Sequence, residues 1–186
     1  MNTNVGLTQG FDQTSDASSQ YLSFILAEEE YAVDILHVQE IRSWEKVTSI
    51  PNTPDYVAGV INLRGVVVPI VDLRRRFGLA STEFGLSTVV VIVTVDGDRG
   101  SRVVGLVADA VSDVYRFAPE SIGDTPEFGG AIGTDYVKGL VSVNEKLIIL
   151  LDIDELITVG VFEANTNQVN EANTNQVNTE ADSFHK

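Results

Sequence analysis

The sequence contains no cysteine, and only two of its 186 residues are histidine. The first absence excludes disulfides, thiolate zinc sites, iron–sulfur ligation and cysteine nucleophiles. His185 is the penultimate residue, which leaves His37 inside an apolar run, and a lone histidine cannot build a metal cluster. No Walker sequence is present, and no GxGxxG follows a strand pattern. We therefore expect no catalytic residues, no metal and no cofactor, so the chain is predicted not to be an enzyme.

Long apolar runs and positive charge are also scarce. No run approaches the about 18 apolar residues that a membrane span needs, and the N-terminus lacks the basic and apolar regions of a signal peptide. Lys and Arg number 12 against 27 Asp and Glu, and the net charge of −15 repels phosphate backbones and anionic lipid. We expect a cytoplasmic protein without direct membrane insertion and without a nucleic-acid partner.

Composition divides the chain into a folded middle and two polar ends. Residues 1–19 are rich in Asn, Thr, Gln, Ser and Gly without hydrophobic periodicity, which predicts a disordered leader. Residues 159–186 contain EANTNQVN twice in succession, at Glu163–Asn170 and Glu171–Asn178. Two copies of a polar octamer cannot bury a repeat core, so this end is predicted to be a disordered tail. The folded domain is then predicted to span residues 20–158.

The middle of the chain reads as a series of short strands. The runs are dominated by Val, Ile, Leu and Phe and are bounded by Gly, Asp, Asn or Pro, which is typical of strands separated by turns. Helical signals are few and short. The predicted strands include Tyr21–Leu26, Val66–Val71, Thr88–Val95, Arg102–Val107 and Leu147–Leu151. The pattern predicts an all-β fold with short helices.

An internal repeat adds a second level of organisation. Tyr56–Phe77 and Tyr136–Ile157 align without a gap at a constant offset of 80 residues. Each copy reads as a strand, a tight turn, a second strand and an Asp placed to cap a helical turn. A weaker echo upstream relates Tyr31–Ile41 to Arg102–Val114. The repeat predicts two similar β-units in one chain.

Motifs spread from about Tyr21 to Ile157 resemble those of the CheW family of bacterial chemotaxis. They include VQEIR at Val38–Arg42, IPNTP at Ile50–Pro54, NLRG at Asn62–Gly65, VPIVDLR at Val68–Arg74, VVGLVAD at Val103–Asp109 and VSDV at Val111–Val114. The resemblance implies two intertwined SH3-like five-stranded β-barrel subdomains, in agreement with the internal repeat.

The resemblance also implies a chemotaxis adaptor that couples methyl-accepting chemoreceptors to the histidine kinase CheA in signalling arrays. Members of this family dock the cytoplasmic tip of a chemoreceptor between the barrels and bind the CheA regulatory domain through barrel ends. Such a cytoplasmic protein would be recruited to membrane-associated chemoreceptor arrays. The alternative is a CheW-like regulatory domain of a kinase or of a related chemosensory pathway that controls pili or another output. An unrelated SH3-like barrel that binds nucleic acid is opposed by the charge.

By the same resemblance, candidate residues of the receptor-binding groove are Val38, Ile41, Gly59, Arg64, Val89, Gly105 and Val114. Helix recognition needs rigid apolar walls, with glycine where backbones approach closely. The valines could equally be core residues, and the glycines could equally occupy bulges or turns. Glu40 and Arg64 resemble a family pair at the rim of this groove, for which an ordinary surface ion pair is the alternative.

Overall fold

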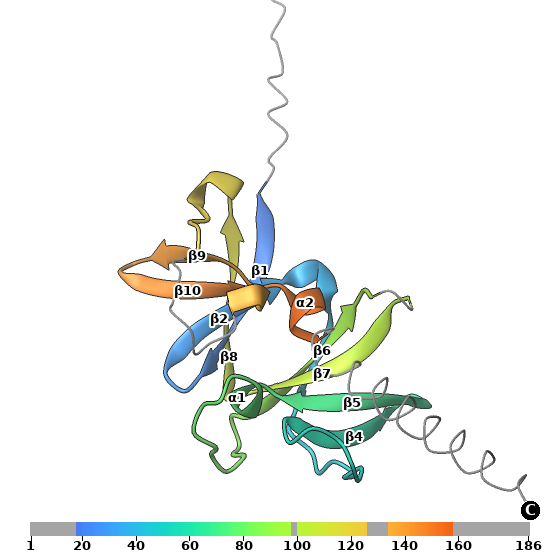
Figure 1. Ribbon diagram of the computed structural model, residues 1–186. Coiled ribbons are helices and arrows are strands. Elements are labelled where there is room, and N and C mark those ends of the chain that lie inside the picture. Colours follow the sequence, from blue (N-terminus) through green and yellow to red (C-terminus); the bar gives the residue numbers. More distant parts are fainter. Residues whose placement is uncertain (1–17, 98–99, 126–133, 158–186) are drawn as a thin grey trace, which may run out of the picture.

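The computed structural model describes residues 18–97, 100–125 and 134–157, and contains two five-stranded sheets (Figure 1). In the first sheet, barrel 1, the order is β8 (Ala110–Phe117), β1 (Ser19–Leu26), β2 (Glu29–Asp34), β10 (Lys146–Leu151) and β9 (Val137–Val143). In the second, barrel 2, it is β3 (Val38–Ser43), β6 (Val89–Val95), β7 (Arg102–Ala108), β5 (Val66–Asp72) and β4 (Val57–Leu63). The predicted all-β fold is confirmed. Nearly all of the predicted leader and the whole tail with its octamer repeat lie outside the described residues.

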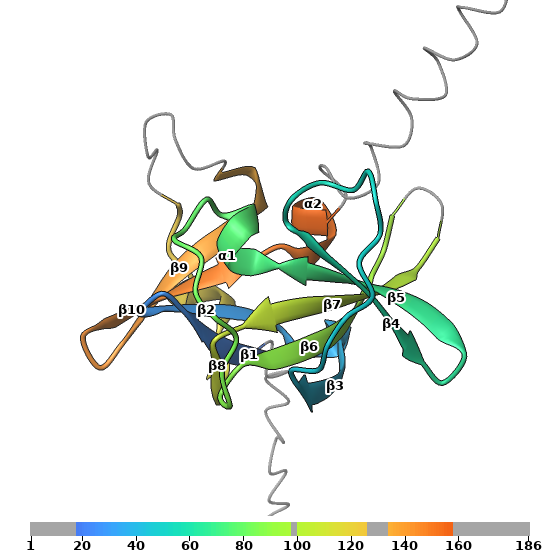
Figure 2. The same ribbon diagram turned by 90° about the horizontal axis from the view of Figure 1, so that it is seen from below.

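The two barrels are intertwined along the chain. β1 and β2 pair with β8 and β10, which come from the last third of the domain, whereas all five strands of barrel 2 lie between residues 38 and 108. Each barrel contains one parallel pair, β2 with β10 and β7 with β5, and the remaining pairs are antiparallel. Figures 1 and 2 show the barrels side by side, with the short helices at their junction.

The internal repeat matches the structure element by element. β4, β5 and α1 (Leu73–Arg76) correspond at an offset of 80 residues to β9, β10 and α2 (Ile153–Ile157). Asp72 and Asp152 cap these helices: Asp72 Oδ1 accepts from the Arg75 N–H at 3.2 Å, and Asp152 Oδ1 accepts from the Glu155 N–H at 3.1 Å. The upstream echo is also confirmed, because β2 and β3 hold the same places in the structure as β7 and β8. Three 3₁₀ turns, η1 (Ile35–His37), η2 (Pro119–Ser121) and η3 (Thr134–Tyr136), complete the fold.

A single backbone bridge closes each barrel over its last strand. Thr48 pairs with Val60 of β4, and Gly123 pairs with Leu140 of β9. The residue before each bridged position is a glycine, and a Cβ on Gly59 would collide with the Thr48 carbonyl oxygen. A Cβ on Gly139 would come within 2.8 Å of the Gly123 carbonyl oxygen. These two glycines therefore permit closure of their own barrels.

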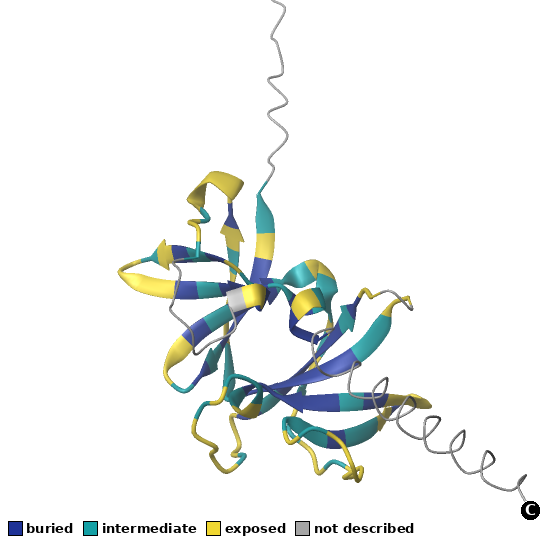
Figure 3. Cartoon of the chain, viewed as in Figure 1, coloured by how far each residue is buried: buried dark blue, intermediate teal, exposed yellow. Residues whose placement is uncertain are grey.

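Figure 3 marks the buried positions along the strands of both barrels. Three groups of buried side chains form the core. One lies within each barrel. The third, the central cluster, joins side chains of both barrels: Leu22, Phe24, Leu26, Val33, Val71, Leu73, Val91, Val93, Val95, Val104, Leu106, Ala108, Tyr136, Leu151, Ile153, Leu156 and Ile157. Because this shared group is the largest, burial of apolar surface between the barrels is a main source of their association.

The three consecutive arginines of α1 face partners within the protein. Arg74 pairs with Asp109 at 2.6 Å, and Arg75 Nε lies 3.3 Å from Asp72 Oδ2. The Arg76 guanidinium lies over the rings of Tyr56 and Tyr136, which are equivalent residues of the two repeats. The basic run therefore joins parts of the fold.

Candidate functional site

The described residues contain no group of His, Asp or Glu side chains that could hold a metal ion. His37 ends η1, and its Nε2 lies 3.5 Å from the Asp154 carboxylate. None of the helices in the described ranges is long and apolar enough to cross a membrane. The features that remain as candidates for function are exposed apolar surfaces, which bind other proteins.

β3 is an edge strand of barrel 2, and a bulge changes the direction of its side chains. Val38 pairs with Val93 and Ile41 pairs with Val91, with an irregular register between Val38 and Glu40. In a regular strand, residues three apart face opposite sides, but here both face the side of their partners. Val91 and Val93 belong to the central cluster, so Val38 and Ile41 both lie at its margin.

β8 is an edge strand of barrel 1 and repeats this arrangement. Val111 pairs with Phe24 and Val114 with Leu22, and the register is again irregular between the two pairs. Phe24 and Leu22 are also members of the central cluster. Since Val38 and Ile41 become Val111 and Val114 when 73 is added, the two edge strands present equivalent residues to the same shared core.

These residues form a surface at the junction of the barrels. Ile41 is 44% and Val114 is 46% exposed, whereas Val38, Val89 and Val111 are partly buried against the central cluster. Val89 lies on β6 and faces the same side as Val91, two residues further along. We call Val38, Ile41, Val89, Val111 and Val114 the β3–β8 surface. Four of the predicted groove residues thus border the same shared core, and two of them, Ile41 and Val114, are nearly half exposed.

Sequence reasoning missed Val111 on this surface. Alternation would place Val111 and Val114 on opposite faces of a strand, so only one of the two could be assigned to a groove. The signal that could have found it is the upstream echo, in which Val111 corresponds to Val38, already a candidate residue.

The two predicted groove glycines lie elsewhere in barrel 2. Gly59 serves the barrel closure at Thr48. A Cβ on Gly105 would come within 2.5 Å of Ile70 Cδ1 and within 2.8 Å of Val90 Cγ1, which belong to the interior of barrel 2. Gly59 lies at an irregularity in the pairing of β4 with β5, which agrees with the bulge that was left open as its alternative. Gly105 lies in a regular stretch of β7, in neither a bulge nor a turn, and is required by interior packing.

Glu40 and Arg64 form the predicted pair, with Arg64 NH2 2.8 Å from Glu40 Oε2. Glu40 pairs with Ile92 in the interior of barrel 2, so its side chain leaves β3 on the face opposite to Ile41. The Arg64 side chain is 81% exposed and lies in the turn between β4 and β5. The pair therefore marks the end of barrel 2, away from the β3–β8 surface.

The turns that end the two repeats expose a second set of apolar side chains. Val66 is 55% and Val67 is 64% exposed after the β4–β5 turn. Leu147, the equivalent of Val67 at the offset of 80, is 49% exposed after the β9–β10 turn. Each barrel thus has an exposed apolar tip.

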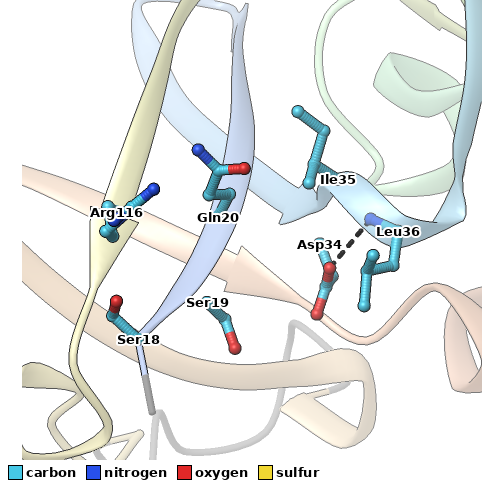
Figure 4. A pocket seen from close by; sticks show the side chains of 7 residues that line it. All are labelled: Ser18, Ser19, Gln20, Asp34, Ile35, Leu36 and Arg116. Carbon is cyan, nitrogen blue, oxygen red and sulfur yellow. Dashed lines mark hydrogen bonds between the residues drawn. The ribbon is translucent and has the colours of Figure 1, made fainter. Parts of the chain in front are cut away.

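A pocket of about 310 Å³ lies where the start of β1 meets η1 and β8 (Figure 4). Gln20 and Arg116 line it from neighbouring strands, and Leu36 lines it from η1. Asp34 is engaged locally, because its Oδ1 accepts a hydrogen bond from the Leu36 N–H at 2.9 Å. Ser18, Ser19 and Ile35 complete the lining.

Comparison with known proteins agrees with this architecture. A sequence model of the CheW-like domain matches residues 20–160. The chain belongs to the CheW family. It is 46% identical over 139 residues to the chemotaxis protein CheW of Klebsiella aerogenes, covering 75% of this chain and 81% of that protein. It is 33% identical over 150 residues to the CheW of Rhizobium meliloti, covering 81% and 94%.

A solved CheW structure shares the fold. The scaffolding protein TtCheW from Thermoanaerobacter tengcongensis matches with a TM-score of 0.67 and 34% sequence identity, covering 75% of this chain and 87% of that one. The CheW resemblance seen in the sequence is therefore confirmed, and so are the two β-units that it implied. The chain is a chemotaxis adaptor of a family that contains scaffolding proteins.

Proposed function

We propose that this CheW-family adaptor couples the cytoplasmic tip of a chemoreceptor to the regulatory domain of the histidine kinase CheA. The proposal rests on one observation above all: bulges in β3 and β8 turn equivalent apolar residues toward the margin of the shared core, where Ile41 and Val114 remain nearly half exposed. A scaffold acts by binding two partners at once, and it needs no catalytic group. We infer that the chain works at membrane-associated receptor arrays as a cytoplasmic protein and not as an enzyme.

The β3–β8 surface suits a helical partner. Helices dock through apolar side chains spaced along one face, and they need a rigid apolar counterpart. Ile41 and Val114 provide exposed contacts, and the central cluster behind Val38, Val89 and Val111 keeps them rigid. Because β3 and β8 come from different barrels, a helix seated here would contact both.

The apolar barrel tips suit the kinase. Val66 and Val67 are exposed beside the Glu40–Arg64 pair, and Leu147 is exposed on the other barrel. Exposed apolar residues next to charged side chains are typical of protein interfaces. We assign kinase binding to these tips because they are separate from the β3–β8 surface, which allows both partners to bind together.

The alternative is a regulatory domain of a related chemosensory pathway, which would have the same fold. The adaptor is favoured because the matched relatives bear the name CheW and the chain covers 81% and 94% of two of them. A pull-down with a receptor-tip fragment and the CheA regulatory domain tests the proposal. We expect a ternary complex that contains all three proteins. Binding of only one partner, or competition between the two, would contradict a coupling role.

A further inference from the structure

Barrel 1 contains a buried polar pair in its interior. The Ser23 residue is 0% and Glu30 is 6% exposed, and the Ser23 hydroxyl donates to Glu30 Oε1 at 2.7 Å. Ser23 pairs with Ala32 and Glu30 with Ile148, and both partners belong to the core of barrel 1. Burial of a carboxylate costs free energy unless hydrogen bonds replace its lost hydration. Core packing alone therefore does not explain why this polar pair is buried.

The Ser23 hydroxyl also binds the backbone of β8. Its Oγ accepts from the Asp113 N–H at 3.0 Å and lies 3.1 Å from the Asp113 carbonyl oxygen. A hydroxyl has one proton, and the shorter contact is the one to Glu30. Glu30 therefore fixes the hydroxyl in the orientation in which its oxygen can accept from β8.

This contact lies at the bulge that shapes the β3–β8 surface. Ser23 has no Cα partner in β8, because Leu22 pairs with Val114 and Phe24 pairs with Val111. The Ser23 side chain supplies the hydrogen bond that a backbone ladder would otherwise supply to Asp113. The next residue is Val114, so the hydroxyl acts one residue from an exposed apolar contact.

The equivalent position in barrel 2 is apolar. Val114 pairs with Leu22 as Ile41 pairs with Val91, so the residue that follows Val91, Ile92, corresponds to Ser23. Ile92 is fully buried and pairs with Glu40 in the ladder of β3. Adding 73 to Glu30 gives Val103, which packs in the interior of barrel 2. The fold itself therefore does not require a polar pair at this place.

We propose that Ser23 and Glu30 are positioning residues for receptor binding, which hold the β8 backbone at Asp113 so that Val111 and Val114 present their side chains to a receptor helix. This inference rests on the function proposed for the β3–β8 surface. The pair acts from the interior of barrel 1 and touches no partner itself. A small change in the β8 edge would displace two of the five surface residues while the barrel tips stay in place.

Removal and rescue of the hydroxyl test this role. In Ser23→Ala the Asp113 N–H loses its acceptor, and we expect about tenfold weaker binding of a soluble receptor-tip fragment, as for the loss of one buried hydrogen bond. Ser23→Thr keeps the hydroxyl and should restore binding. Amide hydrogen exchange at Asp113 and Val114 should be faster in Ser23→Ala and return toward the native rate in Ser23→Thr. Binding of the CheA regulatory domain should not change.

A double variant separates positioning from stability. Ser23→Val combined with Glu30→Val gives barrel 1 the apolar interior that barrel 2 has at these positions. Because the Tyr115 side chain also hydrogen-bonds Glu30, the pair is changed in a Tyr115→Phe background, where the thermal midpoint should match or exceed that of Tyr115→Phe alone. Receptor-tip binding should still fall about tenfold because the acceptor for Asp113 is gone. Ile148→Val, a mild change in the same core, is the control for a general loss of packing and should leave receptor binding unchanged.

The outcomes distinguish this inference from the function on which it rests. If Val114→Asp weakens receptor binding but neither Ser23→Ala nor the double variant does, the positioning role is wrong and the surface remains. If Val114→Asp has no effect on receptor binding, the proposed surface is wrong. Equal loss of receptor and kinase binding in Ser23→Ala, or in the Ile148→Val control, would show a structural role alone.

Discussion

Arg74 and Asp154 occupy equivalent positions in the two repeats and carry opposite charges. Arg74 donates from Nε and NH2 to the two carboxylate oxygens of Asp109, at 2.7 and 2.6 Å. Asp154 lies 3.5 Å from His37 Nε2. Each contact ties the helical turn of one barrel to the connection that enters the edge strand of the other barrel, β8 or β3. Both halves of the molecule therefore contain this contact between helical turn and edge-strand connection. The helical turn supplies an arginine in one half and an aspartate in the other.

Loss of the Arg74–Asp109 pair should destabilise the protein. The two side chains are only 17% and 25% exposed, and the pair is bidentate. We expect Arg74→Ala to lower the free energy of unfolding by about 2 kcal/mol, because a partly buried carboxylate loses its partner. Denaturant unfolding measures the change. Arg64→Ala, at a side chain 81% exposed, is the control and should cost less than about 1 kcal/mol.

The same pair should make stability depend on pH. Burial alone would raise the pKa of the Asp109 carboxyl, but hydrogen bonds from Arg74 and the Ala27 N–H, and the charge of Arg74, lower it below its ordinary value. A carboxyl with a lowered folded pKa stabilises the protein above its unfolded pKa, about 3.9, and loses this contribution as pH falls toward the folded pKa. Asp109→Asn should therefore be less stable than the native protein at pH 7, and the difference should shrink as the pH is lowered below about 4. A constant difference from pH 7 to pH 3 would contradict this assignment.

A charge on the β3–β8 surface should weaken receptor binding without unfolding the protein. Val114 and Ile41 are nearly half exposed, so an aspartate there remains hydrated in the free protein. Bound to an apolar helix face, that carboxylate would be desolvated, and we expect Val114→Asp or Ile41→Asp to cost about 2 kcal/mol of binding or more. Calorimetry with a receptor-tip fragment measures it. The matched control, Val93→Asp, places the charge in the fully buried central cluster and should unfold the protein.

Gly59 should be needed for stability and not for recognition. Its φ of +148° and the nearby Thr48 carbonyl oxygen leave no room for a Cβ. We expect Gly59→Ala to lower the free energy of unfolding by about 2 kcal/mol or more. Gly65→Ala is the control, since Gly65 also has a positive φ of +90° but has no atom within 4 Å of the added Cβ. A smaller loss of unfolding free energy in Gly65→Ala would show that the additional loss in Gly59→Ala comes from the collision with Thr48. Selective loss of receptor binding in Gly59→Ala would instead place Gly59 in the receptor-binding groove.

Arg64 separates the two proposed interfaces. Its side chain is 81% exposed, so Arg64→Ala should change the unfolding free energy by less than about 1 kcal/mol. The residue lies beside the apolar tip of barrel 2, and we expect weaker binding of the CheA regulatory domain with receptor binding retained. Surface plasmon resonance with both partners decides between the sites. The opposite pattern would place Arg64 in the receptor-binding groove, as the sequence resemblance first implied.

Most of the fold could be predicted from the sequence because the internal repeat presents the same pattern of strands and turns in two copies. Tyr56 and Tyr136, and the capping residues Asp72 and Asp152, recur at one offset, and each strand that follows or precedes them recurs as well. Alternation of apolar residues and turn signals then gives strands whose order the duplication limits.

The candidate site was less predictable because it depends on irregular backbone. The bulge in β8 places Val111 beside Val114, and no rule of alternation contains that information. Gly59 and Gly105 have the same residue type as a groove glycine would have, and only their neighbours show that they serve barrel closure and interior packing. Glu40 follows regular alternation from its partner Ile92, which puts it on the far side of β3 from Ile41.

Barrel 1 draws strands from both ends of the domain, and this has a consequence during synthesis. β1 and β2 leave the ribosome first, yet their partners β8 and β10 are translated only after the whole of barrel 2. Barrel 2 can close as soon as β7 has emerged, whereas the apolar faces of β1 and β2 stay uncovered until β8 and β10 have been translated. The nascent chain therefore passes through a stage with one finished barrel and a β1–β2 hairpin whose two outer edges still lack β8 and β10, and at this stage it exposes apolar surface that a chaperone could cover.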